Sequence, residues 1–297
     1  MLQSKLSGAG AAMITPFTAD GRVDYEALAR MIDYVIEGGV DYIVALGTTA
    51  ETPTLYMPER AVIAMFITNQ IAGRVPLVMG CGGNSTSEVL DQLREFDLRG
   101  ADAILSVTPY YNKPSQEGLY QHFRTVSEHS PLPVILYNIP GRAGVNMTAE
   151  TTLRLAREVP NIIGIKEASG NVAYAAKIAH LLSDDFRMYS GEDALTVPLM
   201  SLGASGTISV WADVQPQLVH DMCRAYLDGD VARARDIQIA GQPLINALFS
   251  EVNPIPVKEA LAQMGMIEAN YRMPLCPMAN DTRAALTDAL KGAGLLD

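Results

Sequence analysis

Short runs of apolar residues recur along the chain, and each is followed by a longer segment with helical periodicity. The runs lack the strict alternation of apolar and polar residues that a half-exposed strand shows. Parallel strands that are covered on both faces have this near-continuous pattern. We therefore predict eight buried strands, at Ala11–Thr15, Tyr42–Leu46, Pro76–Gly80, Asp102–Val107, Val134–Asn138, Ile162–Lys166, Arg187–Ser190 and Gly206–Val210.

The segments between these runs are amphipathic. Leu28, Met31, Ile32, Val35 and Ile36, for example, fall on one face of a helix. Strands that alternate with helices imply a parallel sheet with right-handed crossovers. Eight such units favour an α/β fold of the closed (β/α)8 TIM-barrel type over an open doubly wound sheet. The pattern predicts further helices at Pro58–Ala72, Thr86–Arg99, Gln116–Glu128, Ala149–Glu158, Val172–Leu182, Asp193–Leu202 and Pro216–Asp228.

The pattern changes after Asp228, where no further strand is predicted. Helical periodicity covers Arg233–Phe249, Ile255–Met264 and Thr282–Lys291, and prolines separate these segments. We therefore divide the chain into a catalytic barrel, residues 1–228, and a C-terminal helical extension, residues 229–297.

Composition narrows the class of protein. The 297 residues carry a net charge of −11, with a pI of about 4.8, and an acidic chain is a poor ligand for nucleic acid. No apolar run is long enough to cross a bilayer, and no charged-then-apolar leader opens the sequence. We expect a cytoplasmic protein that binds neither nucleic acid nor membranes.

Cysteines and histidines give no sign of a disulfide or a metal site. Cys81, Cys223 and Cys276 are widely spaced, and we expect reduced thiols that behave as small buried apolar residues. His122 and His129 lie seven residues apart in a helical stretch, where we expect them at the surface or in a groove. We expect no metal and no cofactor.

Lys166 is the first candidate for chemistry. It is the only one of the six lysines that directly ends an isoleucine-rich run. Burial there disfavours the ammonium form, which lowers the pKa of the amine, and a free amine in a pocket can form a Schiff base with a carbonyl substrate. The run alone leaves open a structural salt bridge or an amine that reaches the surface.

Polar side chains follow several other predicted strands. In a TIM barrel the carboxyl ends of all strands meet at one mouth, so these side chains are expected to lie around Lys166. Tyrosine and threonine hydroxyls there can relay protons, an arginine can hold a carboxylate through two hydrogen bonds, and backbone amides can bind a small 2-oxo acid. The segments concerned are Gly47–Glu51, Thr108–Pro114, Tyr137–Arg142, Ser190–Asp193 and Thr207–Ser209.

Each of these residues also has a purely structural interpretation. Thr48 and Thr49 can cap the helix that follows, and Tyr110 and Tyr111 can pack within their loop. Tyr137 can be a core residue with a satisfied hydroxyl. Among the remaining charges, Arg142 can lie at the surface, and Glu51 is expected to be a structural carboxylate rather than an acid or base.

At this point a resemblance becomes specific. The chain resembles the pyruvate-dependent class I aldolase and lyase family, and within it the branch that condenses pyruvate with L-aspartate 4-semialdehyde. Five motifs carry the resemblance, in family order and over nearly the whole chain: G-T-T-x-E at Gly47–Glu51, P-Y-Y-N-K-P at Pro109–Pro114, Y-N-I-P-G-R at Tyr137–Arg142, I-K-E-A-S-G at Ile165–Gly170 and N-P-I-P-V-K at Asn253–Lys258.

The resemblance implies the catalytic residues. Lys166 would form the Schiff base with pyruvate. Tyr137, Thr48 and Tyr111 would form a proton relay, with Tyr111 reaching into the site of a neighbouring subunit. The family is typically a homotetramer, a dimer of tight dimers, and its product, 4-hydroxy-tetrahydrodipicolinate, feeds lysine and diaminopimelate synthesis.

The resemblance also implies the substrate-binding residues. Arg142 would bind the carboxylate of L-aspartate 4-semialdehyde. Thr49 and the backbone at Gly191 and Ile208 would help to hold pyruvate and the lysine. One residue of the turn departs from the family, because Ala50 stands where glycine is usual, and a methyl group there would strain the backbone if that position needs a positive φ.

The family's lysine-feedback site is only partly present. Asn84, Glu88 and Tyr110 match this allosteric site. Arg60 brings a positive charge to the place where the ammonium group of an effector would lie, so we expect weak or absent inhibition by lysine. The positions that differ from the sensitive form are Thr52, Pro53, Met57 and Arg60.

Two other functions compete with this interpretation. A sister aldolase, such as N-acetylneuraminate lyase or a 2-keto-3-deoxy sugar acid aldolase, shares the lysine and the barrel, but the sialic acid lyases tend to have K-F-T after the strand and G-S-T before the glutamate. A non-catalytic regulator would bind an oxo acid without turnover. The presence together of Lys166, Tyr137, Thr48, Tyr111 and Arg142 argues against the regulator.

Overall fold

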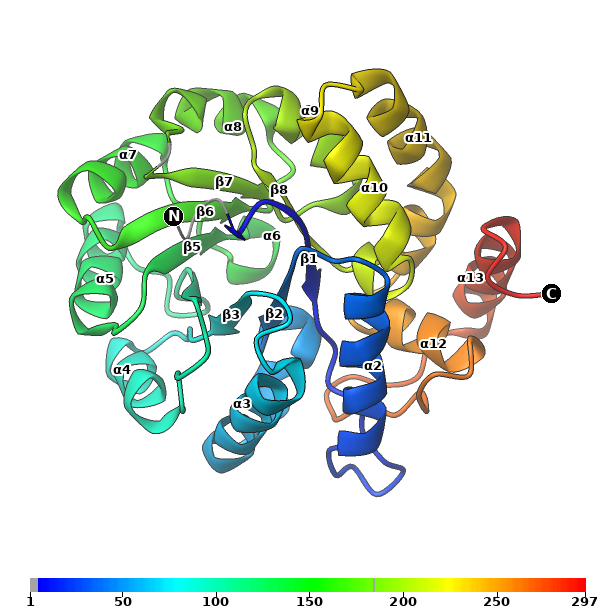
Figure 1. Cartoon of the computed structure of the whole chain (residues 1–297). Coiled ribbons are helices and arrows are strands. Elements are labelled where there is room, and N and C mark those ends of the chain that lie inside the picture. Colours follow the sequence, from blue (N-terminus) through cyan, green and yellow to red (C-terminus); the bar gives the residue numbers. More distant parts are fainter. Residues whose placement is uncertain (1–4, 184) are drawn as a thin grey trace.

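The structure, a computed structural model, describes residues 5–183 and 185–297. Eight parallel strands close into a barrel in sequence order, and β8 pairs with β1 (Figure 1). The predicted TIM barrel is therefore confirmed. The strands are β1 (Gly8–Ala12), β2 (Tyr42–Ala45), β3 (Leu77–Gly80), β4 (Ala103–Val107), β5 (Val134–Asn138), β6 (Ile162–Glu167), β7 (Arg187–Ser190) and β8 (Gly206–Ser209).

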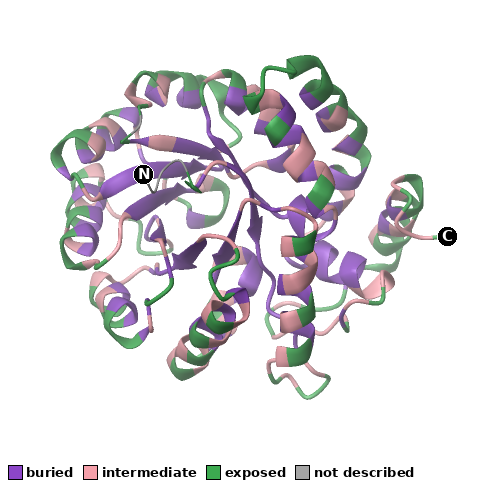
Figure 2. Ribbon diagram, viewed as in Figure 1, coloured by how far each residue is buried: buried purple, intermediate pink, exposed green. Residues whose placement is uncertain are grey.

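Helices form a ring around the strands. Burial follows this arrangement, with buried strands at the centre and helices that expose one face (Figure 2). The helices of the barrel are α2 (Tyr25–Glu37), α3 (Met57–Ile71), α4 (Thr86–Glu95), α5 (Gln116–His129), α6 (Pro140–Ala143), α7 (Ala149–Glu158), α8 (Val172–Ile178), α9 (Thr196–Ser201) and α10 (Pro216–Leu227).

Seven predicted strands agree with the structure to within one residue at each end, and the first prediction was wrong. The strand is Gly8–Ala12, three residues before the predicted Ala11–Thr15. Small residues hid it, because glycine and alanine give a weak apolar signal. The structure needs them there: a Cβ on Gly10 would lie 2.2 Å from the ring of Tyr42, which fills the barrel interior.

Two apolar cores stabilise the barrel. One lies inside it and includes Tyr42 and Tyr189, whose ring centroids are 6.2 Å apart. The larger core lies between the strands and the helices. Several helices begin at a side chain that accepts an N–H of the first turn, which satisfies one of the otherwise unpaired donors there. These caps are Asp24, Ser85, Ser115, Thr148 and Asn171.

Several local predictions need correction. The helix predicted at Thr86–Arg99 ends at Glu95, and a 3-10 turn follows α8 and another precedes α9. His122 is buried rather than at the surface, and its Nδ1 lies 2.8 Å from the hydroxyl of Thr86. Burial lowers the pKa of His122 to about 4, so this imidazole is neutral near neutral pH. Cys81 and Cys223 are buried as expected, but Cys276 is exposed.

The C-terminal helices α11 (Val231–Leu248), α12 (Ile255–Gln263) and α13 (Asn280–Gly292) follow the barrel. Helix α11 packs against α10 and α13, and nearly every residue of α12 is buried. The division at residue 229 stays a prediction, because these helices are attached to the barrel by many contacts.

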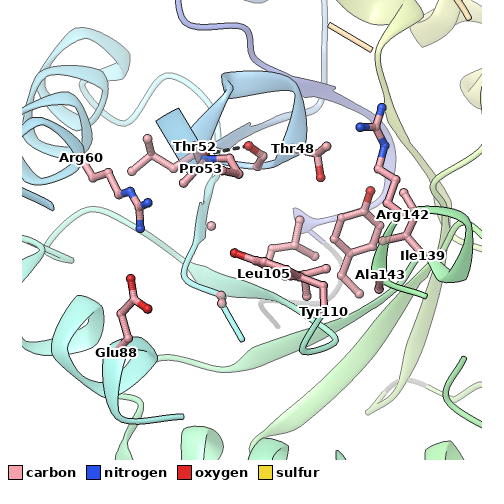
Figure 3. Close-up of a pocket in the computed structure, with 17 residues that line it drawn as sticks. Thr48, Thr52, Pro53, Arg60, Glu88, Leu105, Tyr110, Ile139, Arg142 and Ala143 are labelled. Atoms are coloured by element: carbon pink, nitrogen blue, oxygen red, sulfur yellow. Dashed lines mark hydrogen bonds between the residues drawn. The ribbon is translucent and has the colours of Figure 1, made fainter. Parts of the chain in front are cut away.

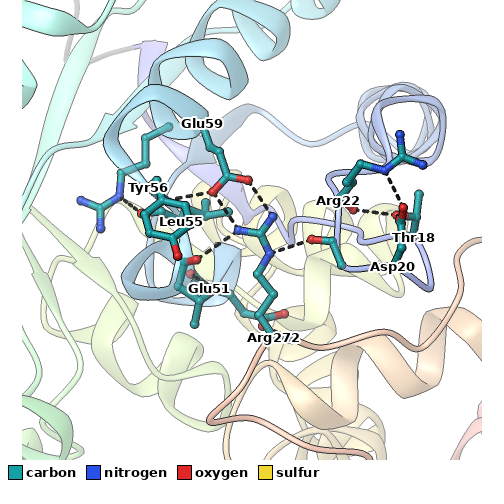
Figure 4. Close-up of polar contacts among 11 residues, drawn as sticks. Thr18, Asp20, Arg22, Glu51, Leu55, Tyr56, Glu59 and Arg272 are labelled. Atoms are coloured by element: carbon teal, nitrogen blue, oxygen red, sulfur yellow. Dashed lines mark hydrogen bonds and ion pairs between the residues drawn. The ribbon is translucent and has the colours of Figure 1, made fainter.

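Arg272 joins the extension to the barrel (Figure 4). Its guanidinium donates to both carboxylate oxygens of Glu59, at 2.7 and 2.8 Å, and to the carbonyls of Gly21 and Thr54. Its backbone N–H donates to Glu51 Oε2 at 3.2 Å. The segment between α12 and α13 is therefore held against the loop that follows β2.

We predict that Glu59→Gln lowers the free energy of unfolding by about 1 kcal/mol near neutral pH, since a two-pronged charged contact is lost. The hydrogen bond from Arg272 lowers the pKa of Glu59 below its ordinary value of 4.5. The stabilisation is therefore complete above that value and disappears as the pH falls through the lower pKa of the folded state. Denaturant unfolding of both proteins across the acid range measures it. The matched control is Asp236→Asn, which removes an exposed pair with Arg235 and should change little.

Candidate active site

Lys166 and Tyr137 lie side by side at the mouth of the barrel. They are register partners on β6 and β5, and Tyr189 of β7 is the next partner. Both side chains are almost fully buried, and Lys166 Nζ lies 4.5 Å from the centroid of the Tyr137 ring. The predicted strand end therefore places the amine at the mouth, next to a phenol.

No carboxylate among residues 5–183 and 185–297 forms an ion pair with the amine of Lys166, although its charge lowers the pKa of Asp193 and Glu192 against the effect of burial. Among the residues that the structure describes, none lies within ion-pair or hydrogen-bond distance of its Nζ. This excludes the structural salt bridge that the sequence left open. Gly191 leaves room for the side chain, because a Cβ there would lie 2.8 Å from Lys166 Cε and 2.7 Å from the Cβ of Ala168.

Asn138 and Glu167 fix the two strands on their outer face. Each follows a mouth residue and points the other way, since side chains alternate along a strand. Asn138 Nδ2 donates to Glu167 Oε2 at 3.0 Å, and the backbone N–H groups of Met147 and Ser169 donate to Asn138 Oδ1 and Glu167 Oε1. Burial raises the pKa of Glu167, and these hydrogen bonds oppose the rise. This pair was not predicted from the sequence, although strand alternation was the signal for it.

A cavity of about 260 Å³ opens above the strand ends (Figure 3). Thr48 and Arg142 lie at one end of it, and Arg60 and Glu88 lie at the other. Tyr137 also lines the cavity, and the ring of this tyrosine contacts Lys166. The cavity places a tyrosine, a threonine and an arginine within one volume suited to a small substrate.

The turn that follows β2 carries Thr48 and Thr49. It is a short 3-10 helix, Thr48–Ala50, and Thr52 Oγ1 donates to the carbonyl of Gly47 at 2.8 Å. Neither threonine acts as a side-chain cap, which excludes that alternative. Ala50 does not have a positive φ, so its methyl group causes no strain of that kind; the positive φ, 54°, falls on Glu51. This conformation costs a non-glycine residue about 1–2 kcal/mol.

Arg142 lies on α6, a single helical turn that the sequence analysis missed. Its side chain is exposed toward the cavity, and one N–H donates to the carbonyl of Asn253 at 2.9 Å. Asn253 also donates from Nδ2 to Thr49 Oγ1 at 3.0 Å. The motif at Asn253–Lys258 thus reaches the site from the extension, although the sequence alone suggested no role for it.

Tyr111 is not part of the cavity of its own chain. Its side chain is 88% exposed, and its φ of 70° is left-handed. Packing within the loop is therefore excluded for Tyr111. Asn112, the next residue, donates to the carbonyl of Asn84 at 3.0 Å, which ties the loop to the chain beyond β3.

The ends of β7 and β8 close the remaining side of the mouth. Gly191 donates its N–H to the carbonyl of Glu167, and Ile208 is buried within the barrel. Asp193 Oδ2 accepts from the N–H groups of Val210 and Trp211, so it fixes the chain just beyond β8. Gly191 therefore lies against the Lys166 side chain, and the contacts of Asp193 fix the end of β8 that carries Ile208.

Two of the three residues matched to a lysine site lie at the far end of the cavity. Glu88 and Tyr110 line it with Arg60, Thr52 and Pro53, whereas Asn84 does not. Burial raises the pKa of Tyr110, with a further contribution from the charge of Glu88.

The described residues offer no metal site, since no three His, Cys, Asp or Glu side chains come together in that part of the chain. No helix there is long and apolar enough to span a membrane. What the mouth does offer is the buried amine of Lys166 against the ring of Tyr137, and a cavity lined by Tyr137, Thr48 and Arg142. That arrangement suits capture of a carbonyl and proton transfer within a carboxylate-binding pocket.

Fold and site together define an enzyme of the class I aldolase and lyase type. The model of the Dihydrodipicolinate synthetase family matches residues 5–293, and the chain belongs to that family. The 4-hydroxy-tetrahydrodipicolinate synthase of Parabacteroides distasonis is 47% identical over 98% of both chains. Among solved structures, dihydrodipicolinate synthase from Acinetobacter baumannii complexed with pyruvate is 43% identical, with a TM-score of 0.94 over 98% of this chain and 99% of that one. The enzyme from Cyanidioschyzon merolae with lysine bound is 39% identical, with a TM-score of 0.95 over 98% and 99%.

We predict that Gly191→Ala slows covalent capture of an oxo acid by Lys166 by about 10-fold or more, because the added methyl displaces the lysine side chain from a packed site. Single-turnover borohydride trapping measures the rate. Gly141→Ala is the matched control, since a Cβ there meets no atom within 4 Å. Equal rates for Gly191→Ala and the unmodified protein would contradict the prediction.

Proposed function

We propose that the barrel mouth condenses pyruvate with L-aspartate 4-semialdehyde, the 4-hydroxy-tetrahydrodipicolinate synthase reaction of lysine and diaminopimelate biosynthesis. The observation that carries this proposal is the unpaired, buried amine of Lys166 beside Tyr137, within a chain similar to these enzymes over nearly its full length.

The reaction begins with attack of Lys166 Nζ on C2 of pyruvate. Loss of water gives a Schiff base, and loss of a C3 proton gives an enamine. The enamine carbon attacks the aldehyde, whose oxygen becomes a hydroxyl group. The amino group of the second substrate then attacks C2 and closes the ring, which releases the lysine amine. Tyr137, Thr48 and Tyr111 of a neighbouring subunit relay the protons of these steps.

Two groups suit the two carboxylates. Thr49 Oγ1 already accepts a hydrogen bond from Asn253, so its own hydrogen is available to donate to pyruvate, together with the backbone near Gly191 and Ile208. Arg142 uses one N–H on the carbonyl of Asn253, and its remaining donors can bind the carboxylate of the aldehyde substrate.

The test of this function is a coupled assay with pyruvate and L-aspartate 4-semialdehyde, run beside cleavage of N-acetylneuraminate. We expect turnover of the first substrates, and borohydride with pyruvate should add mass to Lys166. Lys166→Ala should abolish trapping and leave the unfolding transition intact. Lys177→Ala, which alters a lysine of α8, is the control. Turnover of N-acetylneuraminate alone would assign the chain to the sister aldolases, and trapping without turnover of any substrate would favour a non-catalytic regulator.

The assembly is part of the proposal. A tyrosine that is 88% exposed on a loop is suited to a place in a neighbouring subunit, as the resemblance implies for Tyr111. We propose tight dimers that pair into a homotetramer in the cytoplasm.

The proposed effector site comprises Asn84, Glu88 and Tyr110, of which Glu88 and Tyr110 line the far end of the cavity. We predict weak or absent inhibition by lysine, because the guanidinium of Arg60 repels an ammonium group there. Initial rates over a lysine titration measure this. Arg60→His should increase sensitivity, whereas Arg157→His, outside the cavity, should not. An inhibition constant well below millimolar for the unmodified protein would contradict the prediction.

A further inference from the structure

The turn that carries Thr48 and Thr49 needs external support. It lies between two non-glycine residues with left-handed backbone, Leu46 with a φ of 53° and Glu51 with a φ of 54°. Such conformations persist only where the surrounding structure holds them. Within the turn, only two backbone hydrogen bonds close the 3-10 helix, at 3.1 and 3.3 Å.

The support comes from a buried ion pair. Glu51 Oε1 lies 2.6 Å from Lys258 Nζ, and both side chains are fully buried. In the described part of the chain, Glu51 is the only carboxylate within ion-pair distance of Lys258. The ammonium also lies 4.2 Å from the centroid of the Phe17 ring, and Glu51 Oε2 accepts the N–H of Arg272. The carboxylate is thus held on both oxygens.

Stability is a poor explanation for this pair. The desolvation of two buried charges usually equals or exceeds their attraction, and apolar residues of similar volume often stabilise a fold as well. Burial lowers the pKa of Lys258, and the nearby Glu51 opposes this shift. The ion pair does fix the orientation of the turn relative to α12, which a non-directional apolar contact would not do.

A second contact acts from the same end of α12. Asn253 Nδ2 donates to Thr49 Oγ1, and the Asn253 carbonyl accepts from Arg142. Residues 253 and 258 flank the first turn of a helix whose residues Ile255–Leu261 are all buried. The extension therefore contacts the catalytic turn at Thr49 and at Glu51, from one rigid element.

We propose that Glu51 and Lys258 are positioning residues: through their ion pair the C-terminal extension sets the place of Thr48 and Thr49 at the barrel mouth. This inference rests on the proposed function, since Thr48 must move protons for its place to affect the rate. A displaced turn leaves Lys166 itself in place, so borohydride still traps pyruvate on it at saturating pyruvate, while the steps that depend on proton transfer through Thr48 slow.

The test uses the double variant Glu51→Gln/Lys258→Met in the full chain. It removes both charges, so neither is left buried alone, and it should unfold close to the temperature of the unmodified protein. We expect its kcat to fall by about 10- to 100-fold while borohydride still traps pyruvate on Lys166. Lys258→Met alone, which leaves a buried unpaired carboxylate, should lose both stability and kcat.

A matched control is available in the same extension. Arg283 Nε lies 2.6 Å from Glu259 Oε1, and this pair does not contact the mouth. Glu259→Gln/Arg283→Met should keep the kcat of the unmodified protein at a similar unfolding temperature. Glu51→Asp tests the idea without removing charge, because it shortens the connection by one methylene, and it too should lower kcat.

Unchanged kcat in both the double variant and Glu51→Asp would overturn the positioning role. That result is distinct from failure of the proposed function, which would appear as absent trapping or turnover in the unmodified protein.

Discussion

Closure of the barrel is the constraint on which the site depends. Because β8 pairs back to β1, every strand ends at the same mouth, and residues far apart in the sequence become register neighbours. Tyr137, Lys166 and Tyr189 lie in one row across β5, β6 and β7. Alternation then sends Asn138 and Glu167 outward, where they bind one another. The barrel therefore places Tyr137, Lys166 and Tyr189 on one face of the strands, and Asn138 and Glu167, which join β5 to β6, on the other.

Much of this could be predicted from the sequence. The continuous apolar runs gave the strands, and the strand ends gave Lys166, Tyr137, Thr48 and Arg142. The prediction of the first strand failed because this strand consists of glycine and alanine, whose small side chains an apolar pattern does not detect. A role for Tyr111 could be predicted only from the resemblance and not from spacing, because its side chain has no partner site within the described part of its own chain.

Other features could not be predicted because they join distant segments. The bonds from Asn253 to Thr49 and from Lys258 to Glu51 span 204 and 207 residues. No local pattern indicates such a pairing, and a buried lysine in a helix looks like a surface charge until the fold is known. The left-handed backbone at Glu51 was not predicted either, because a positive φ was considered only for Ala50, the residue before it.

The attachment of α12 also bears on how the protein is made. A chain folds from its N-terminus as it leaves the ribosome, and all eight strands precede Asn253. Lys166 is therefore present in the nascent barrel before Asn253 and Lys258, which bind Thr49, Arg142 and Glu51, have been synthesised. The turn that follows β2 can therefore take its final contacts only after α12 has been synthesised and has packed against the barrel.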